Sequence, residues 1–385
     1  MTSIKYMEYV AREKESPAVK CLVGGRWKYF DLGFYPYFFV SVEYRDELER
    51  LKRRGVIYDY ECGDFRLFSR LLGKKKMIKV YAYKPGDVRQ LRDKFAITGE
   101  ADIIFVRRFG LDTGIYYFQS DIRWCVYDIE TDMEGNRILC IGAKGCDGKE
   151  FYVDVESMSE VDMLREFDEF LRSYDILIGF NNWEFDDVVI ESRVDKLGVK
   201  LRWWNYIQKL DARAFLIEFY NDVKELWERS LDQVAKLFGG VGKKLVDRYD
   251  LDTILRDVSL RREYNMWDVE QTWLVVRNSG LVELLSILYR LGFPESVKDI
   301  VRSTWSVISG LLMRYALDDE ARGETRWVIP TRKHLEEWCW RKYLRRMAEG
   351  YKGALVLEPS ASGVIRNVIQ LDFVSLYPNI LMSFN

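Results

Sequence analysis

The stretch RWCVYDIETD, residues 123–132, joins an apolar body to an acidic end. Its apolar residues and Tyr127 predict a central strand of a sheet. Side chains alternate along a strand, so Asp128 and Glu130 point to the same face. Two carboxylates on one face repel each other unless a cation lies between them. Taken alone, this pair is better explained as a solvated strand end.

The segments that follow alternate between strand and helix patterns. RILCIGAKGCDGKEFYVDV (137–155) predicts a hairpin that turns at Cys146-Asp147-Gly148. DILIGF (175–180) predicts a short buried strand. Helices are expected from the S-x-x-D cap at Ser159, over NNWEFDDVVIESRVDKLG (181–198), over SLDQVAKLFGG (230–240) and over REYNMWDVEQTWLVVRNSG (262–280). A mixed sheet with helices on its faces, from about 123 to 290, is the economical interpretation.

The flanking parts are different in texture. Before residue 123, aromatic and β-branched runs alternate with charged helical stretches, which predicts a small α/β domain. The runs are WKYFDLG (27–33), YPYFFVSV (35–42), KKMIKVYAY (75–83) and ADIIFVRRFG (101–110), and the helical stretches are RDELERLKRRG (45–55) and PGDVRQLRDKF (85–95). After residue 292, two long helices are predicted over 294–317 and 333–350, before a closing strand that begins near 368.

Composition limits the kinds of site that the chain can hold. Net charge is −2, so nucleic acid would have to bind local basic patches. The single His, His334, excludes His-rich zinc sites, and any metal should be a hard ion held by carboxylates. The six Cys form no C-x-x-C pair and are expected to be buried free thiols in a reducing compartment. No apolar run approaches ~18 residues, so we expect a cytoplasmic, nucleoid-associated protein without a membrane span.

Three further residues carry chemistry only when they are taken together with the first strand. Asp186 lies in the first turn of a predicted helix, and Tyr264 and Asp268 are four apart on another. Alone, Asp186 would be an ordinary first-turn acid and the other two would be surface residues. Together, four acids from three elements could converge on two divalent ions, which activate a water for phosphodiester cleavage. Tyr264 could orient that water.

This order of motifs resembles the tyrosine-bearing branch of the DEDD 3′–5′ exonucleases, whose domain is RNase H-like. YDIET, IGFNNWEFD and YNMWD are similar to its three exonuclease motifs. YKGALV and LDFVSLYPNI resemble the linker motif and the first palm motif of the family B DNA polymerases, closest to the archaeal replicative type. The resemblance implies an N-terminal domain (1–122), an exonuclease domain (123–292) and the start of a polymerase palm (293–385).

The resemblance also implies a role for each matching residue. Two Mg²⁺ or Mn²⁺ ions would be held by Asp128, which bridges both, and by Glu130, Asp186 and Asp268, and Tyr264 would hold the attacking water. Asn181 and Phe185 would contact the frayed primer 3′ end. Asp372 would be a metal ligand of the palm, Tyr377 would lie under the sugar of the incoming nucleotide, and Tyr351 and Gly353 would steer the primer.

Some positions depart from the family pattern. Ala354 stands where a second Gly is usual, so primer partitioning can differ, whereas Asn379 is expected to have little effect. FYPYFFV matches one wall of the archaeal template-uracil pocket with Pro36 and Tyr37, but core packing of Tyr37 is an equal alternative. Four basic runs are each either a solvated face or a phosphate track: LKRRG (51–55), GKKKMIK (73–79), RRF (107–109) and WRKYLRRM (340–347).

The implied function is that of a family B DNA polymerase, a nucleotidyltransferase that replicates DNA and carries a proofreading 3′–5′ exodeoxyribonuclease. Its partners would be primer–template DNA and, by the same resemblance, a sliding clamp. A fingers motif and a second palm Asp do not fit within residues 373–385. Polymerisation is therefore expected to need a second chain or a missing C-terminal segment with fingers, the rest of the palm and thumb. The alternative is a non-catalytic DNA-binding scaffold that completes a split polymerase.

Overall fold

The computed structural model describes the greater part of the chain up to residue 337. The described residues are 4–10, 16–23, 26–31, 33–67, 74–115, 122–220, 230–241, 249–294, 296–302, 304–321, 325–337 and 340. Residues 1–336 form one compact unit, and all the elements below belong to it. The fold is mixed α/β, as the sequence predicts.

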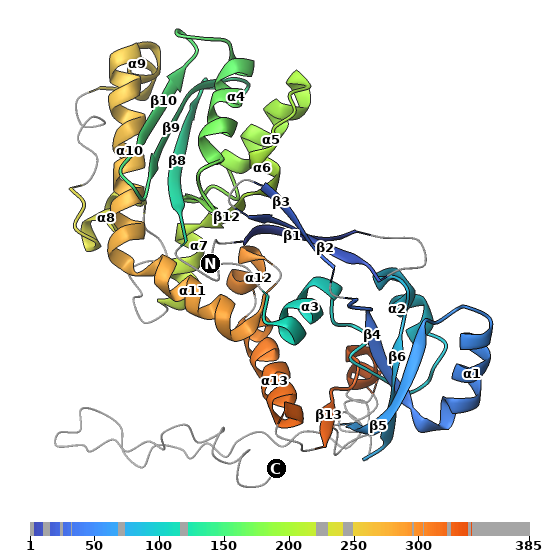
Figure 1. Cartoon of the computed structure of the whole chain (residues 1–385). Coiled ribbons are helices and arrows are strands. Elements are labelled where there is room, and N and C mark those ends of the chain that lie inside the picture. Colours follow the sequence, from blue (N-terminus) through green and yellow to red (C-terminus); the bar gives the residue numbers. More distant parts are fainter. Residues whose placement is uncertain are drawn as a thin grey trace, which may run out of the picture. The chain divides into compact units, whose positions relative to one another are not determined.

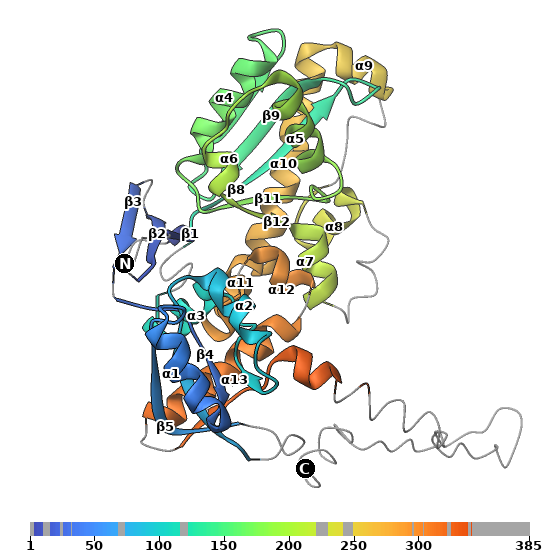
Figure 2. The same ribbon diagram turned by 90° about the vertical axis from the view of Figure 1, so that its right-hand side faces the viewer.

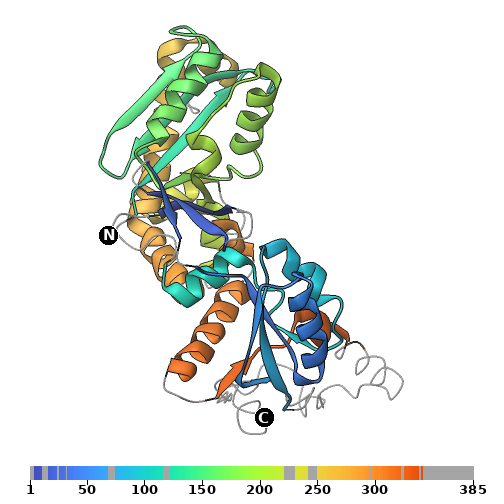
Figure 3. The same cartoon turned by 45° about the vertical axis from the view of Figure 1, so that its right-hand side comes forward.

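A five-stranded sheet organises the N-terminal part, in the order β13-β5-β6-β4-β7. Its strands are β4 (Tyr37–Ser41), β5 (Asp59–Leu67), β6 (Lys76–Tyr81), β7 (Thr98–Gly99) and β13 (Arg326–Val328). A short 3₁₀ turn, η1 (Val42–Tyr44), leads from β4 into α1 (Arg45–Arg53). Side chains of α1 and of α2 (Pro85–Arg92) pack on one face of this sheet, and Figure 3 shows these helices in blue and teal.

The last strand of this sheet comes from far along the chain. β13 pairs in parallel with β5, and Val328 packs with Phe39 and Phe65 of the N-terminal strands. Part of the segment that follows the exonuclease motifs therefore completes the N-terminal sheet. The proposed boundaries of the three domains stay a prediction.

Two N-terminal features differ from the sequence prediction. The run ADIIFVRRFG is not a strand but leads into a helix, α3 (Phe105–Thr113), because Phe105, Arg108 and Phe109 are buried with the spacing of one helix face. The second feature is a separate antiparallel sheet of three strands, β1 (Ile4–Val10), β2 (Ala18–Val23) and β3 (Arg26–Phe30). The strands β1 and β2 were not predicted, because apolar and polar residues do not alternate clearly along them.

The second five-stranded sheet has the order β10-β9-β8-β11-β12. β8 (Trp124–Thr131), β9 (Ile138–Gly145) and β10 (Glu150–Asp154) are antiparallel, whereas β11 (Ile176–Gly179) and β12 (Gln208–Asp211) run parallel to β8. The predicted hairpin is therefore confirmed, since Gly148 N donates to Gly145 O in the turn between β9 and β10. The strand that begins with Trp124 is central, as its apolar body predicts.

Helices cover both faces of this sheet (Figures 1 and 2). α4 (Glu160–Leu171), α5 (Asp186–Leu197) and α6 (Trp203–Tyr206) pack on one face. α10 (Val258–Ser279) packs on the other face, against β8 and β9. The remaining helices are α7 (Ala212–Phe219), α8 (Leu231–Leu237), α9 (Leu251–Arg256), α11 (Leu281–Gly292), α12 (Val297–Arg302) and α13 (Thr304–Ala321).

Local signals explain where the helices begin and end. Ser159 accepts a hydrogen bond from Asp162 N at the start of α4, as the S-x-x-D motif predicts. Gly198 and Gly280 end α5 and α10 with left-handed backbone, which glycine adopts at little cost. One prediction was wrong: α5 begins at Asp186 rather than near Asn181. Within the predicted helix 294–317, the described residues from Val297 to Arg302 (α12) and from Thr304 onward (α13) are helical.

In the part of the chain that the structure describes, no helix is long and apolar enough to cross a membrane.

Five cysteines among the described residues are free thiols, and Cys21, Cys125 and Cys140 are buried as expected. Cys62 is exposed, so the expectation of burial was wrong at that position, which lies on an exposed stretch of β5.

Candidate active site

The acidic end of β8 faces α10. Val126 shares a hydrophobic core with Val269 and Trp273 of α10, whereas Tyr127 and Ile129 pack on the opposite face with α4. The alternation of the strand then directs Asp128 and Glu130 toward α10 as well. The sheet thus presents both carboxylates to the helix that carries the third exonuclease-like motif.

Asp268 of α10 meets the two carboxylates of β8. One oxygen from each of Asp128, Glu130 and Asp268 lies within 4.8 Å of the other two. Asp268 is buried and the β8 pair is half-buried, so water screens their mutual repulsion only in part. Three converging carboxylates of this kind could hold a divalent cation. Because all the donors are oxygen atoms, the group suits a hard ion such as Mg²⁺ or Mn²⁺.

The fourth predicted acid lies at the same end of the strand. Asp186, the first residue of α5, accepts a hydrogen bond from Ile129 N at 3.3 Å, and Ile129 lies between Asp128 and Glu130 in the chain. Burial, together with smaller contributions from the neighbouring Asp187 and Asp211, raises the pKa of Asp186 to about 7, although hydrogen bonds from the backbone N–H groups of Ile129 and Asp186 lower it. A charged Asp186 is therefore costly unless a cation lies nearby. Asp186 is close to the three-acid group but is not a member of it by distance.

Tyr264 lies one helical turn before Asp268 on α10 and is half-buried. That spacing puts its side chain on the same side of the helix as Asp268. The arrangement is compatible with the predicted role in orienting a water, which stays a prediction.

The turn before α5 holds the two residues that are expected to contact the frayed 3′ end of a DNA primer. Asn181 has left-handed backbone (φ 66°), and its N–H donates to Asp211 at 3.1 Å. Arg213 donates a hydrogen bond to the side-chain oxygen of Asn181 at 3.2 Å, so the amide nitrogen of Asn181 points away from Arg213. Phe185 is 47 % exposed and is thus available to stack on a base.

Three residues behind the site were not predicted from the sequence. Asp187, next to Asp186, accepts hydrogen bonds from Tyr127 Oη at 2.6 Å and from Asn182 Nδ2 at 3.2 Å, and all three side chains are buried. Burial raises the pKa of Asp187, although these two donors oppose the rise. The network ties the start of α5 to β8, and only the D-D pair in FDD hinted at it.

Asn265, adjacent to Tyr264, was also missed. Its Nδ2 donates to the backbone oxygen of Asp128 at 3.1 Å and to Asp128 Oδ2 at 2.8 Å. The residue carries an uncharged side chain, so no argument from carboxylates or metals singled it out.

Several predicted residues lie outside the described part of the chain. These are the palm and linker positions, Tyr351, Gly353, Ala354, Asp372, Tyr377 and Asn379, together with nearly all of the basic run 340–347. Of the other basic runs, RRF was predicted wrongly. Arg108 is 3 % exposed and ion-paired to Glu100 at 2.5 Å, so it is neither solvated nor available to a phosphate.

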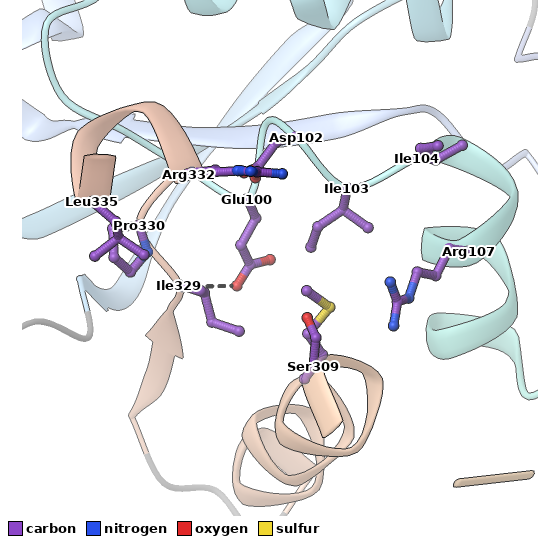
Figure 4. A pocket seen from close by; sticks show the side chains of 11 residues that line it. Glu100, Asp102, Ile103, Ile104, Arg107, Ser309, Ile329, Pro330, Arg332 and Leu335 are labelled. Carbon is purple, nitrogen blue, oxygen red and sulfur yellow. Dashed lines mark hydrogen bonds between the residues drawn. The ribbon is translucent and has the colours of Figure 1, made fainter. Parts of the chain in front are cut away.

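A cavity of about 270 Å³ lies between residues 100–107 and residues 309–335 (Figure 4). Its deepest charged group, Glu100, accepts hydrogen bonds from Arg108, Arg326 and Ile329 N. These protein partners use the carboxylate fully, which indicates a structural role. Pro36 and Tyr37 are buried nearby, and Tyr37 Oη donates to Asp112 at 2.6 Å, in keeping with core packing.

Comparison with known proteins agrees with the motifs. Residues 125–225 match the family model described as DNA polymerase family B, exonuclease domain, and residues 309–385 match DNA polymerase family B. A DNA polymerase of Pyrococcus glycovorans is 27% identical over 92% of this chain and 50% of its own length. DNA polymerase 1 of Sulfurisphaera ohwakuensis is 30% identical over 59% of this chain and 27% of its own.

A solved structure shares the fold. It is that of a family B DNA polymerase from Pyrobaculum calidifontis, similar with a TM-score of 0.66 and 20% identity over 86% of this chain and 52% of that one. The chain thus spans about half the length, or less, of the relatives it matches.

Proposed function

We propose that this chain, whose residues 125–225 and 309–385 match the exonuclease and polymerase models of the family B DNA polymerases, removes nucleotides from the 3′ ends of DNA in a metal-dependent exonuclease reaction. The observation that carries the proposal is the convergence of Asp128, Glu130 and Asp268 within 4.8 Å, with Asp186 hydrogen-bonded to the same strand end. A protein that only bound DNA or completed a scaffold would gain nothing from carboxylates placed so close together.

Each residue of the site has its own role in the proposed reaction. Asp128, Glu130, Asp186 and Asp268 would hold two Mg²⁺ or Mn²⁺ ions, which supply an activated water and charge stabilisation at the scissile phosphate. Tyr264 positions the attacking water through its hydroxyl. Asn181 and Phe185 hold the terminal nucleotide, Asn181 through its amide and Phe185 by stacking, which tolerates any base sequence.

The rest of the proposed function concerns the polymerase. Asp372 and Tyr377 would contribute to the palm, and Tyr351 and Gly353 would guide the primer between the two sites. Synthesis would also use the fingers, thumb and second palm carboxylate that family B polymerases carry. Primer–template DNA is the proposed substrate, and a sliding clamp is a proposed partner.

The decisive experiment is a degradation assay on 5′-labelled single-stranded DNA with added Mg²⁺. We expect a ladder of products shortened from the 3′ end, absent in EDTA and absent in the Asp128→Ala/Glu130→Ala variant. The matched control is Glu134→Ala/Asp195→Ala, which removes two exposed acids of the same domain and should keep full activity.

Two results would overturn the proposal. One is a folded wild-type chain that degrades no DNA and instead binds DNA or a partner chain tightly, which would favour the scaffold alternative. The other is full activity in Asp128→Ala/Glu130→Ala. An RNA oligonucleotide of the same sequence in parallel reactions tests whether the substrate class is DNA.

A further inference from the structure

The side chain of Asn265 is buried between α10, which carries it, and the strand β8. It is fully buried, and it belongs to the same turn of α10 as Tyr264 and Asp268. Its side chain reaches Asp128 twice, at the backbone oxygen and at Oδ2. One amide group therefore holds both the backbone oxygen and one carboxylate oxygen of Asp128.

The orientation of this amide follows from its partners. A carbonyl oxygen and a carboxylate oxygen can only accept hydrogen bonds, so the NH₂ group of Asn265 must face Asp128. The side-chain oxygen of Asn265 has no hydrogen-bond partner among the described residues, although it is buried. A buried acceptor left in this state is uncommon in folded proteins and calls for an explanation.

The sheet leaves a space for this side chain. Gly142 of β9 is the cross-strand partner of Asp128. A Cβ atom at Gly142 would lie 2.0 Å from Asn265 Oδ1, so any other residue there would push the amide away. The absence of a side chain at Gly142 thus leaves the room in which the amide of Asn265 contacts Asp128.

We propose that Asn265 is a positioning residue, which fixes the carboxylate of Asp128 in the orientation that binds the metal ion. The inference rests on the proposed exonuclease function and extends it by one residue. A neutral amide is suited to this task because it orients the carboxylate without cancelling its charge, as a Lys or Arg would. A carboxylate that is held at one oxygen, on a residue whose backbone oxygen the same amide also holds, loses little freedom when a cation arrives.

The test measures metal binding separately from catalysis. Mn²⁺ is titrated into wild type, Asn265→Ala and Asn265→Leu, and free Mn²⁺ is followed by electron paramagnetic resonance. We expect both variants to bind Mn²⁺ about tenfold more weakly, as is typical when an outer partner of a metal ligand is removed. Leu keeps the buried volume, so it separates the lost donor from a lost fold. Asn278→Ala, on the exposed C-terminal part of the same helix, should bind Mn²⁺ as the wild type does.

Gly142 supplies a second and independent test. Gly142→Ala should lower both the melting temperature and the Mn²⁺ affinity, because it displaces Asn265. Gly142→Ala/Asn265→Ala should regain melting temperature, since the obstructed side chain is gone, yet it should bind Mn²⁺ as weakly as Asn265→Ala. A purely structural contact would instead let the double variant regain Mn²⁺ affinity together with stability.

The outcomes separate this inference from the exonuclease proposal. Unchanged Mn²⁺ affinity in Asn265→Ala and Asn265→Leu, with loss of binding in Asp128→Ala/Glu130→Ala, would overturn only the role of Asn265. Wild-type Mn²⁺ binding in Asp128→Ala/Glu130→Ala would overturn the metal site itself.

Discussion

Replacement of Glu100 by Gln should destabilise the protein far more than any exposed acid would. Glu100 is 3 % exposed and accepts hydrogen bonds from Arg108 at 2.5 Å and from Arg326 at 3.0 Å, two guanidinium groups that are themselves buried. Its other oxygen accepts from Ile329 N at 3.2 Å, the contact drawn in Figure 4. The carboxylate therefore joins β7, α3 and the returning strand β13.

The magnitude follows from what is left behind. Gln has nearly the same shape, so packing is kept, but both buried guanidinium groups lose the negative charge of Glu100, and Arg108 keeps the more distant carboxylate of Asp112 at 3.9 Å. Removal of one partner from a buried ion pair typically costs about 3–5 kcal/mol of unfolding free energy. With an unfolding entropy of about 2.1 cal/mol/K per residue, a unit of 336 residues should then melt about 4–7 °C lower.

The pH dependence supplies a stricter test. Burial by itself would raise the pKa of Glu100, but Arg108, Arg326 and the Ile329 N–H outweigh it and hold the pKa below its usual range. A carboxyl group with a lowered folded-state pKa contributes stability above its unfolded pKa and loses it as the pH falls through the folded pKa. The melting difference between wild type and Glu100→Gln should thus be constant above about pH 5.5 and shrink in more acidic buffer.

Calorimetry across pH 3–8 measures both effects, with Glu169→Gln as the control. Glu169 pairs with Arg172 at 2.9 Å, but both side chains are 60% exposed, so its loss should cost under about 1 kcal/mol. If the two variants melted alike, or if the Glu100→Gln difference grew in acid, the reasoning about this network would be wrong.

Three further predictions concern the exonuclease domain. Ser159→Ala should cost about 1 kcal/mol in urea denaturation because it removes the cap of α4, whereas Ser230→Ala should cost less, since Ser230 makes no side-chain cap bond to α8. Tyr127→Phe should cost about 1–3 kcal/mol by leaving Asp187 with one fewer donor, against less than 1 kcal/mol for Tyr81→Phe at the exposed Glu61 contact; equal costs would contradict it. Arg213→Ala should raise KM for single-stranded DNA severalfold in the degradation assay with a smaller change in kcat, while Arg165→Ala on the exposed face of α4 should leave both constants unchanged.

The sequence predicted the exonuclease part of the fold well, because its signals are local. The alternation in RWCVYDIETD, the turn at Gly148 and the cap at Ser159 each involve a few neighbouring residues, and the structure has all three. The N-terminal part was harder. ADIIFVRRFG is rich in β-branched and aromatic residues, and only tertiary burial of Phe105 and Phe109 decides in favour of a helix.

Long-range pairing could not be predicted from local pattern. β13 is three residues long, and its register with β5 depends on Val328 filling a pocket that N-terminal side chains form. Nothing in RWV itself identifies that partner. The same limit applies to Arg108, whose burial depends on Glu100 and Arg326 rather than on its own neighbours in RRF.

The candidate site shows the same division in its chemistry. The acids could be predicted because four carboxylates in a fixed order have few other uses, although each of them alone would be an ordinary acid. Asn265 could not, since an Asn on a helix acquires a role only through Gly142 and Asp128, which a separate hairpin brings to it. The carboxylates of these motifs can thus be predicted from the sequence, whereas the residue that we propose to orient one of them can be found only from the packing. Tests of such a site that change only its acids would leave the orienting residues undetected, because the loss of a ligand hides the smaller effect of its misplacement.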